Sequence, residues 1–305
     1  MLKWRRNNGF GSINAGGCDF MNNPSAPSAA MAAAADAATG RNNLSISFVF
    51  ITYNEEKNIG RALESVKEVA DEIIILDSGS ADKTLEIASN YGAKIYHNKF
   101  SGFAAQKNLA VSYARKDYIF VLDADEELTP GLKEWISDFK TLKLKSRFYE
   151  AAGFYAPRKS SFIGRWINYS GWFPDYTLRL IKRGAGAFKK ARVHESLEVN
   201  GAAIKIDSHN YIRHYTYDSL EQYFDKFNSY TSLAARDLLE RGAKPSAAKI
   251  LINPLFSFLK QYFIKRGFLD GFHGLILAIL SAFYVFVKYC KLYFLARAAG
   301  GELNK

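Results

Sequence analysis

Apolar runs of strand length alternate with segments of helix length from Leu44 to about residue 140. The expected strands span residues 44–54, 72–76, 93–97 and 118–122. The expected helices span residues 54–69, 85–91, 104–114 and 130–139. Strands that alternate with helices at this spacing form right-handed crossovers, which give a parallel sheet covered by helices on both faces. The sequence therefore predicts an α/β layer over this part of the chain.

The first expected helix carries boundary signals. Asn54 suits an N-cap, and Glu55 and Glu56 suit the positive end of the helix dipole. The apolar residues that follow share one helical face: Ile59, Ala62, Leu63 and Val66. We therefore expect this helix to begin at Asn54.

Polar clusters follow three of the four expected strands. They read TYNEE at residues 52–56, DSGSADKT at 77–84 and DADEE at 123–127. Each cluster alone could be turn chemistry, since Asp, Ser, Gly and Asn are common in turns for backbone reasons. The carboxyl ends of parallel strands, however, meet at one edge of a sheet, where ligands bind. Three clusters at that edge favour a binding site.

The third cluster has two interpretations. In the first, a strand leaves the core, a solvated turn follows, and Pro130 opens the next helix. In the second, Asp123 and Asp125 present two carboxylates to one divalent cation, because hard cations take oxygen ligands.

Several nucleotide-binding classes are excluded by missing motifs. No GxGxxG follows the first strand and no GxxxxGK[ST] occurs, which removes a dinucleotide-binding Rossmann site and a P-loop. An aspartyl-phosphate phosphatase would need its Asp-x-Asp after the first strand, and here it follows the fourth. What remains is a sheet that holds a nucleotide by side chains and its diphosphate through a metal.

The net charge of +11 is regional. Residues 241–305 hold ten Lys and Arg against two Asp and Glu, and residues 141–200 hold twelve against four. Such basicity suits nucleic acid, a membrane surface or an anionic substrate. Because the C-terminal basic residues are interleaved with long apolar runs and no nucleic-acid module is recognisable, we expect no nucleic-acid partner.

The N-terminal segment predicts no folded structure. Residues 22–43 are rich in Ala, Ser and Asn, so residues 1–43 are expected to be a disordered leader. The basic start lacks the apolar core of a signal peptide. Cys18 and Cys290 provide neither a disulfide framework nor a cysteine zinc site, so a cytosolic setting is expected.

Residues 216–305 are expected to form a helical, basic and apolar region. Its longest uncharged apolar stretch, Gly274 to Val287, has 14 residues, fewer than the about 20 that a spanning helix needs. We therefore expect a helix lying in a membrane interface; a helix packed on the α/β domain is the alternative. The basic residues expected to face anionic headgroups are Lys260, Lys265, Arg266, Lys288, Lys291 and Arg297.

Four segments in order, FVFITYNEEKNIGRALESV, DEIIILDSGSADKTLEIA, AAQKNLA and FVLDADEEL, resemble family 2 glycosyltransferases of the GT-A fold over roughly residues 44–215. Further on, GWFPDYTLRLIKRG, VHESLEVNG and IRHYTYDSLEQYFDKFNSYTSLAA resemble the branch of bacterial lipopolysaccharide core β-1,4-glucosyltransferases. The ordered set of motifs is specific, although no single motif is.

The resemblance implies roles for a UDP-sugar site. Thr52 and Tyr53 would line the uridine, with Glu55 among the donor-binding residues, and Asp77 would accept the uracil imide proton. Lys107 would meet the diphosphate; the alternative is a solvated helix lysine. Asp125 would bind Mg²⁺ or Mn²⁺, and Asp123 would face the ribose or the waters of the metal.

The resemblance also implies a carboxylate base that takes the acceptor proton in an inverting transfer. Glu195 is the first candidate and Asp175 the second. His194 could bind metal or phosphate, although a lone His in a strand is more often simply hydrogen-bonded. Arg179 and Arg183 could pair with phosphate groups, against an alternative of plain surface charge.

These features together predict a peripheral enzyme on the cytoplasmic face of the inner membrane. It would move a hexose, glucose from UDP-glucose, to an inner-core heptose of lipopolysaccharide, a lipid-linked acceptor. The alternatives are a hexosyltransferase acting on polyprenyl phosphate and a non-catalytic, membrane-bound protein that binds a sugar nucleotide.

Overall fold

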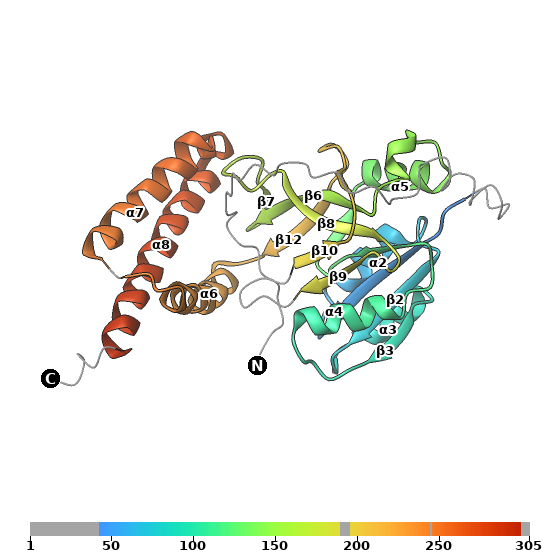
Figure 1. The fold of residues 1–305 in the computed structure, drawn as a ribbon, viewed down its shortest axis with the longest axis horizontal. Helices are drawn as coiled ribbons and strands as arrows, with labels where there is room; N and C mark the ends of the chain where they lie inside the picture. Colours follow the sequence, from blue (N-terminus) through green and yellow to red (C-terminus); the bar gives the residue numbers. More distant parts are fainter. Residues whose placement is uncertain (1–42, 190–195, 245, 300–305) are drawn as a thin grey trace. The chain divides into compact units, whose positions relative to one another are not determined.

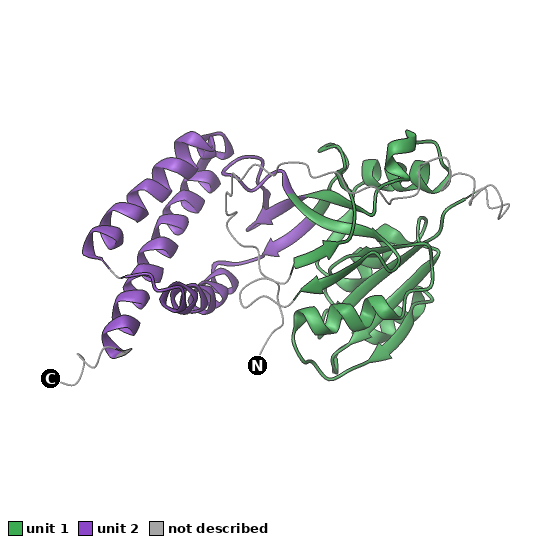
Figure 2. Cartoon of the chain, viewed as in Figure 1, with its two compact units in different colours: residues 1–157, 176–189, 196–213 green, residues 158–175, 190–195, 214–305 purple. Residues whose placement is uncertain are grey.

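The computed structural model describes residues 43–189, 196–244 and 246–299. These residues form two compact units (Figure 2). Unit 1 comprises residues 43–157, 176–189 and 196–213, and unit 2 comprises residues 158–175 and 214–299. The predicted leader, apart from Asn43, lies outside the described residues.

The order of elements follows the predicted alternation at first and then changes (Figure 1). The strands are β1 Ile46–Thr52, β2 Glu72–Asp77, β3 Lys94–His97, β4 Tyr118–Val121, β5 Glu126–Leu128, β6 Gly153–Phe162, β7 Arg165–Trp166, β8 Asp175–Lys182, β9 Gly186–Lys189, β10 Ser196–Val199, β11 Ala203–Lys205 and β12 Ile212–Tyr217. The α-helices are α2 Ile59–Val66, α3 Thr84–Asn90, α4 Phe103–Ser112, α5 Pro130–Lys140, α6 Leu220–Glu240, α7 Ala247–Leu259 and α8 Gly271–Ala299. Shorter helical turns are η1 Ser146–Phe148, η2 Lys260–Ile264 and η3 Gly267–Asp270.

Strands β3, β2, β1 and β4 pair in that order and all run parallel, as the sequence predicts. The sheet continues through β8, β6, β12 and β5, and β8 is antiparallel to β4. In the register of β1 with β2, Thr52 lies opposite Asp77. Both strands therefore end at the same level, which puts their following loops side by side.

Alternate residues of β1 and β2 serve two separate apolar cores. Phe48 and Phe50 face a core shared with α2 and α5, and the rings of Phe48 and Phe120 stack with centroids 5.1 Å apart. Val49 and Ile74 face a second core that includes residues of α4. Helices thus cover both faces of the parallel strands, as predicted.

The first helix begins later than expected. It starts at Ile59, and Asn58, not Asn54, precedes it, so the predicted cap at Asn54 is wrong. Asn54 instead adopts a positive φ of 53°, and its side-chain oxygen accepts a hydrogen bond from the Ala81 amide at 2.8 Å. Tertiary bonding to the next loop has overridden the local capping preference.

Unit 2 is built around the helices α6, α7 and α8. Leu277 of α8 packs with Phe227 of α6 in its apolar core, together with Phe162 and Tyr223. Of the described helices, the one spanning residues 267–298 is long and apolar enough to cross a membrane. From the sequence we counted only the 14 uncharged residues that end before Lys288, and we concluded that the stretch is too short to span a membrane. The helix continues past Lys288, so that conclusion is wrong.

We expect the aromatic cluster around α5 to dominate the stability of unit 1. Phe139 is fully buried, and its ring lies 4.9–5.5 Å from the rings of Tyr118, Trp135, Tyr149 and Phe154. Phe139→Ala should lower the free energy of unfolding by about 3–5 kcal/mol. Urea denaturation is the measurement, with Lys143→Ala as the control, because the exposed ion pair of Lys143 with Asp138 should contribute under about 1 kcal/mol. Similar losses for the two variants would contradict the assignment.

Candidate active site

The loops after β1 and β2 are joined by reciprocal hydrogen bonds. The Asn54 amide donates to Ser80 Oγ at 2.9 Å, and the Ala81 amide donates back to Asn54 Oδ1. Further along, the Glu55 amide donates to Thr84 Oγ1 at 2.8 Å. The first two polar clusters of the sequence are therefore linked by hydrogen bonds into one pair of loops.

Asp82 also links the two loops. Its carboxylate accepts hydrogen bonds from the amides of Glu56 and Thr84 and from the Thr84 hydroxyl. Burial alone would raise the pKa of Asp82, but these hydrogen bonds lower it below its ordinary value. The carboxylate stays charged and holds both loops at neutral pH.

Asp77, at the end of β2, is fully buried. Its oxygens accept hydrogen bonds from Thr52 Oγ1 at 2.9 Å, from the amides of Gly79 and Ser80 at 2.8 Å each, and from Ser80 Oγ. These four bonds match the four lone-pair sites of a carboxylate. A uracil imide could reach Asp77 only by replacing one of them. The predicted contact with the base stays a prediction.

The four acidic residues after β4 divide into two pairs. Asp123 and Asp125 line a pocket, although only 4% and 7% of their surface is exposed. Glu126 is fully buried and pairs with Arg179. Glu127 pairs with Arg213 at 3.0 Å and lies 3.7 Å from Arg61 Nε. The two aspartates thus serve the pocket, and the two glutamates hold the turn in place.

The pocket lies in unit 1 at the carboxyl ends of the parallel strands, as the sequence predicts. It is lined by Ile51, Thr52, Tyr53, Glu55, Ser78, Phe100, Phe103, Asp123, Ala124 and Asp125. Five of the predicted site residues are among them: Thr52, Tyr53, Glu55, Asp123 and Asp125. With Ser78 from the second cluster, the structure therefore brings residues of all three polar clusters to one place.

Sequence reasoning missed two aromatic residues in this pocket. Phe100 and Phe103 come from the loop after β3 and the start of α4, and their rings meet edge to face at 5.3 Å. The sequence offered one signal for them, because the short loop NKFSGF contains two phenylalanines. Large apolar side chains in a loop usually contact a ligand or a core.

Lys107 does not line the pocket but lies one turn along α4 from Phe103. It is 3% exposed, and its Nζ lies 4.9 Å from the centre of the Phe188 ring. The alternative of a solvated lysine is therefore wrong. Its neighbour Gln106 is fully buried and donates to Ser78 Oγ at 2.9 Å, which ties α4 to the pocket loop.

Arg179 of β8 is buried, so the alternative of a plain surface charge is wrong, and its pairing with a phosphate stays a prediction. It is 5% exposed, its NH2 donates to Glu126 Oε1, and both terminal nitrogens lie 3.4 Å from Asp123 Oδ2. It neutralises the buried carboxylates and fixes Asp123 at the pocket. Arg183 is exposed, as the surface alternative holds.

The two candidate bases differ in what the structure says of them. Glu195 and His194 lie outside the described residues. Asp175 belongs to unit 2, and its Oδ2 accepts hydrogen bonds from Nε and NH2 of Arg158. Its side chain is 42% exposed, so it can reach solvent or a substrate.

The pocket suits a divalent cation carried with a diphosphate. No group of three or more His, Cys, Asp or Glu that could hold a metal occurs among the described residues. Mg²⁺ in nucleotide sites, however, is bound through one or two carboxylates together with substrate phosphates. Asp123 and Asp125 supply those carboxylates, so the residues present fit the ion only with a phosphate substrate.

Comparison with known proteins identifies the class of protein. The family model of glycosyl transferase family 2 matches residues 47–143. A glycosyltransferase of Rickettsia bellii is 33% identical over 256 residues, covering 81% of this chain and 85% of that protein. The lipopolysaccharide core biosynthesis glycosyltransferase LpsC of Rhizobium meliloti is 29% identical over 256 residues, covering 82% and 92% of the two chains. Residues 1–349 of TarS from S. aureus, solved with UDP-GlcNAc, match with a TM-score of 0.44 and 14% identity, covering 84% and 92%.

With such relatives spanning most of both chains, this protein is a glycosyltransferase, and unit 1 carries the nucleotide-binding sheet of the GT-A fold. More narrowly, the chain belongs to glycosyl transferase family 2. The predicted family, fold and enzyme class are confirmed, and the non-catalytic alternative is set aside.

We expect Arg179 to hold the acidic turn together. Arg179→Met leaves the charges of Glu126 and Asp123 buried without their cation, so it should cost about 3–5 kcal/mol of unfolding free energy. Arg213→Met, which breaks a pair whose arginine is 40% exposed, should cost about 1 kcal/mol or less. Urea denaturation compares the two variants. Adding Glu126→Gln to Arg179→Met should recover part of the loss, and no recovery would contradict a charge effect.

Proposed function

We propose that this enzyme transfers a hexose, glucose from UDP-glucose, to an inner-core heptose of lipopolysaccharide with inversion at the anomeric carbon. It would act peripherally on the cytoplasmic face of the inner membrane. The observation that carries the proposal is the convergence of Thr52, Tyr53, Asp123 and Asp125 in one pocket at the strand ends. The likeness to LpsC, whose name places it in lipopolysaccharide core biosynthesis, supports the class of acceptor.

The donor would lie along the pocket from its nucleoside end to its diphosphate. Tyr53 offers a ring face to the base, and Thr52 is positioned by its hydrogen bond to Asp77. The edge-to-face pair Phe100 and Phe103 supplies apolar surface on the same pocket. Lys107 would neutralise phosphate charge from its buried position on α4.

Asp125 would hold Mg²⁺ or Mn²⁺, with Asp123 facing the ribose or the waters of the metal. The bound ion would supply positive charge at the diphosphate, which stabilises UDP as a leaving group. Arg179 holds the Asp123 carboxylate through its two terminal nitrogens, so Asp123 is positioned before the donor binds. The acceptor hydroxyl would lose its proton to Glu195 or to Asp175.

The donor and acceptor can be identified by UDP release from the purified full chain in detergent with Mn²⁺. We expect UDP-glucose to be the preferred donor in a panel of UDP-sugars, and release to rise when inner-core lipopolysaccharide is added. Polyprenyl phosphate belongs in the acceptor panel. Stimulation by polyprenyl phosphate and not by lipopolysaccharide would contradict the proposed acceptor.

The two pocket carboxylates should differ from the turn carboxylates in their effect on activity. Asp125→Asn should reduce acceptor-stimulated UDP release by on the order of 100-fold or more, since an ion at the leaving group contributes several kcal/mol. Glu127→Gln is the matched control, because Glu127 faces Arg213 and not the pocket. Measurement across a Mn²⁺ titration should show the loss only for Asp125→Asn. Equal losses in both variants would point to a folding defect instead.

The base can be assigned by comparing Glu195→Gln with Asp175→Asn. Loss of the general base should lower the turnover number by about 10²–10⁴-fold while UDP binding, measured by calorimetry, is retained. We expect this pattern for Glu195→Gln. Asp175→Asn should give a smaller loss, because its carboxylate already accepts two hydrogen bonds from Arg158. The reverse order of effects would move the assignment to Asp175.

A further inference from the structure

Helix α7 of unit 2 exposes an apolar face. None of its residues is buried, and its other side lies along α8, where Ser257 Oγ and Ser281 Oγ are 3.2 Å apart (Figure 1). At 100° per residue, the exposed apolar side chains fall within an arc of about 140°. They are Leu251 (70% exposed), Ile252 (62%), Leu255 (61%), Phe256 (59%) and Leu259 (42%).

The same exposure continues through the turns that connect α7 to α8 and into the first turn of α8. Phe263, Ile264, Phe268, Leu269 and Phe272 are 45–72% exposed. We call these ten side chains, from Leu251 to Phe272, the α7 face. They are ten of the 19 large apolar side chains exposed in the described parts of the chain, yet they come from only 22 residues. Scattered exposed apolar residues are ordinary, but a concentration of this kind marks an interaction surface.

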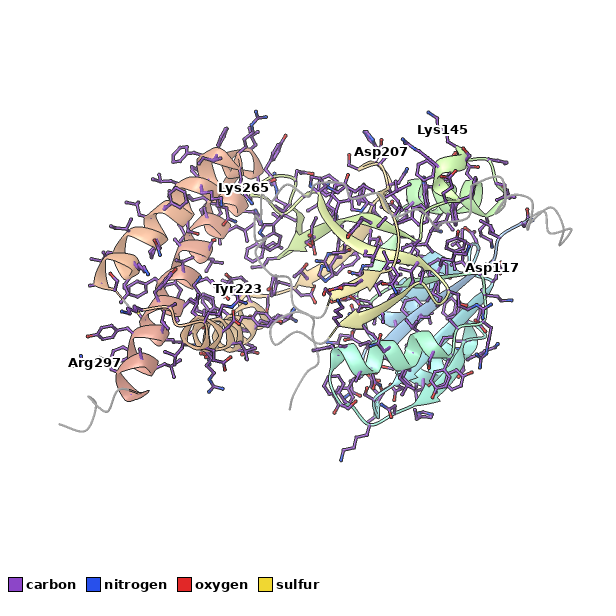
Figure 3. All side chains as sticks on the ribbon, viewed as in Figure 1. Asp117, Lys145, Asp207, Tyr223, Lys265 and Arg297 are labelled. Atoms are coloured by element: carbon purple, nitrogen blue, oxygen red, sulfur yellow. The ribbon has the colours of Figure 1, made fainter. Side chains whose placement is uncertain are left out.

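The exposed charged side chains of the stretch that carries the α7 face are of one sign. Lys249 and Lys260 fall just outside the apolar arc on the helix, and Lys265 and Arg266 lie in the turn that follows (Figure 3, where Lys265 is labelled). The one acidic residue in the described part of this region, from 241 to 299, is Asp270. It is 2% exposed and accepts hydrogen bonds from the amides of Asn168 and Tyr169 and from Ser170 Oγ. The described residues between 241 and 299 therefore present lysine and arginine to solvent but no carboxylate.

Helix α8 has the length to span a bilayer, but its contacts describe a packed helix. Lys291 Nζ donates to Asn228 O at 2.9 Å, to Thr231 Oγ1 at 2.7 Å and to Ser232 Oγ at 2.8 Å, all on α6. Leu277, Ala278 and Leu292 are buried at 0–1% exposure. A spanning arrangement would have to break the bonds of Lys291 and pull these side chains out of their core. Exposed large apolar side chains are denser in the α7 face, with ten in 22 residues, than in the rest of α8, where Ile279, Phe283, Phe286 and Phe294 are 39–60% exposed.

We propose that the α7 face inserts into the interface of an anionic bilayer with α7 lying flat, while α8 beyond Phe272 does not span the hydrocarbon and acts as the packed support of α7. Apolar side chains on one face of a helix, bordered by basic residues, are the pattern of an interfacial helix. Lysine and arginine at its border attract anionic headgroups, and the absence of an exposed carboxylate in this stretch removes the opposing repulsion. The inference deepens the proposed function, which requires a lipid-linked acceptor, but membrane docking can be measured without any sugar transfer.

Flotation of the purified full chain with lipid vesicles tests the proposal. We expect the protein to float with vesicles that contain phosphatidylglycerol and to bind vesicles of phosphatidylcholine alone at least tenfold more weakly. Ile252→Glu/Phe256→Glu should abolish flotation. Leu142→Glu/Leu233→Glu, which changes two exposed apolar residues outside the α7 face, should float like the parent protein. Lys249→Gln/Arg266→Gln should weaken binding by about fivefold per charge and reduce its sensitivity to salt.

Three outcomes would overturn the proposal. One is unchanged flotation of Ile252→Glu/Phe256→Glu with a native circular dichroism spectrum and native UDP affinity. A second is resistance of the membrane-bound protein to extraction at alkaline pH, which would indicate a spanning α8. The third is a dimer in sedimentation analysis that this double variant dissociates, since a second copy would then cover the face. Flotation measures binding to lipid vesicles, whereas UDP release in detergent measures sugar transfer. A failure of the membrane-docking proposal can therefore be told apart from a failure of the proposed function.

Discussion

The buried ion pair of Arg179 with Glu126 and Asp123 is the interaction on which the site depends. Three charged groups sit at 5% exposure or less, where an unpaired charge would be costly. The pair joins β8 to the turn after β4, and these strands are also neighbours in the sheet. Asp123, one of the two pocket carboxylates, is therefore held by a residue of the sheet itself. A side chain that is already ordered can bind a diphosphate or its cation without the entropy cost of ordering it on binding.

The parallel half of the fold could be predicted from the sequence, because its strands are continuous apolar runs and its helices show helical spacing. Phe48 and Val49 illustrate this, since neighbouring residues serve opposite cores and both must be apolar. The start of the first helix could not be predicted. Asn54 has the local preference of a cap, but its hydrogen bond to the Ala81 amide depends on a loop 27 residues away. Local propensity carries no information about such a partner.

The site shows the same division between what is local and what is not. Thr52, Tyr53, Asp123 and Asp125 were predictable because each follows directly from the end of a strand, and strand ends share an edge. Arg179 was misjudged because its partners are more than fifty residues away, and nothing near it in sequence distinguishes a buried arginine from a surface one. The buried state of Lys107 was missed for a similar reason, since Phe188, the ring beneath it, comes from a distant strand.

Asp270 is buried between the α7 and α8 helices and the segment before β8. Its carboxylate accepts hydrogen bonds from the Asn168 and Tyr169 amides and from the Ser170 hydroxyl, and the Ser170 amide donates to the Lys265 carbonyl at 3.0 Å. These hydrogen bonds join the turns between α7 and α8 to the segment that leads to Asp175. Removing the C-terminal helices would therefore leave the Asn168 and Tyr169 amides without their acceptor. A truncation meant only to improve solubility would also loosen a segment of the chain that ends at a candidate catalytic carboxylate.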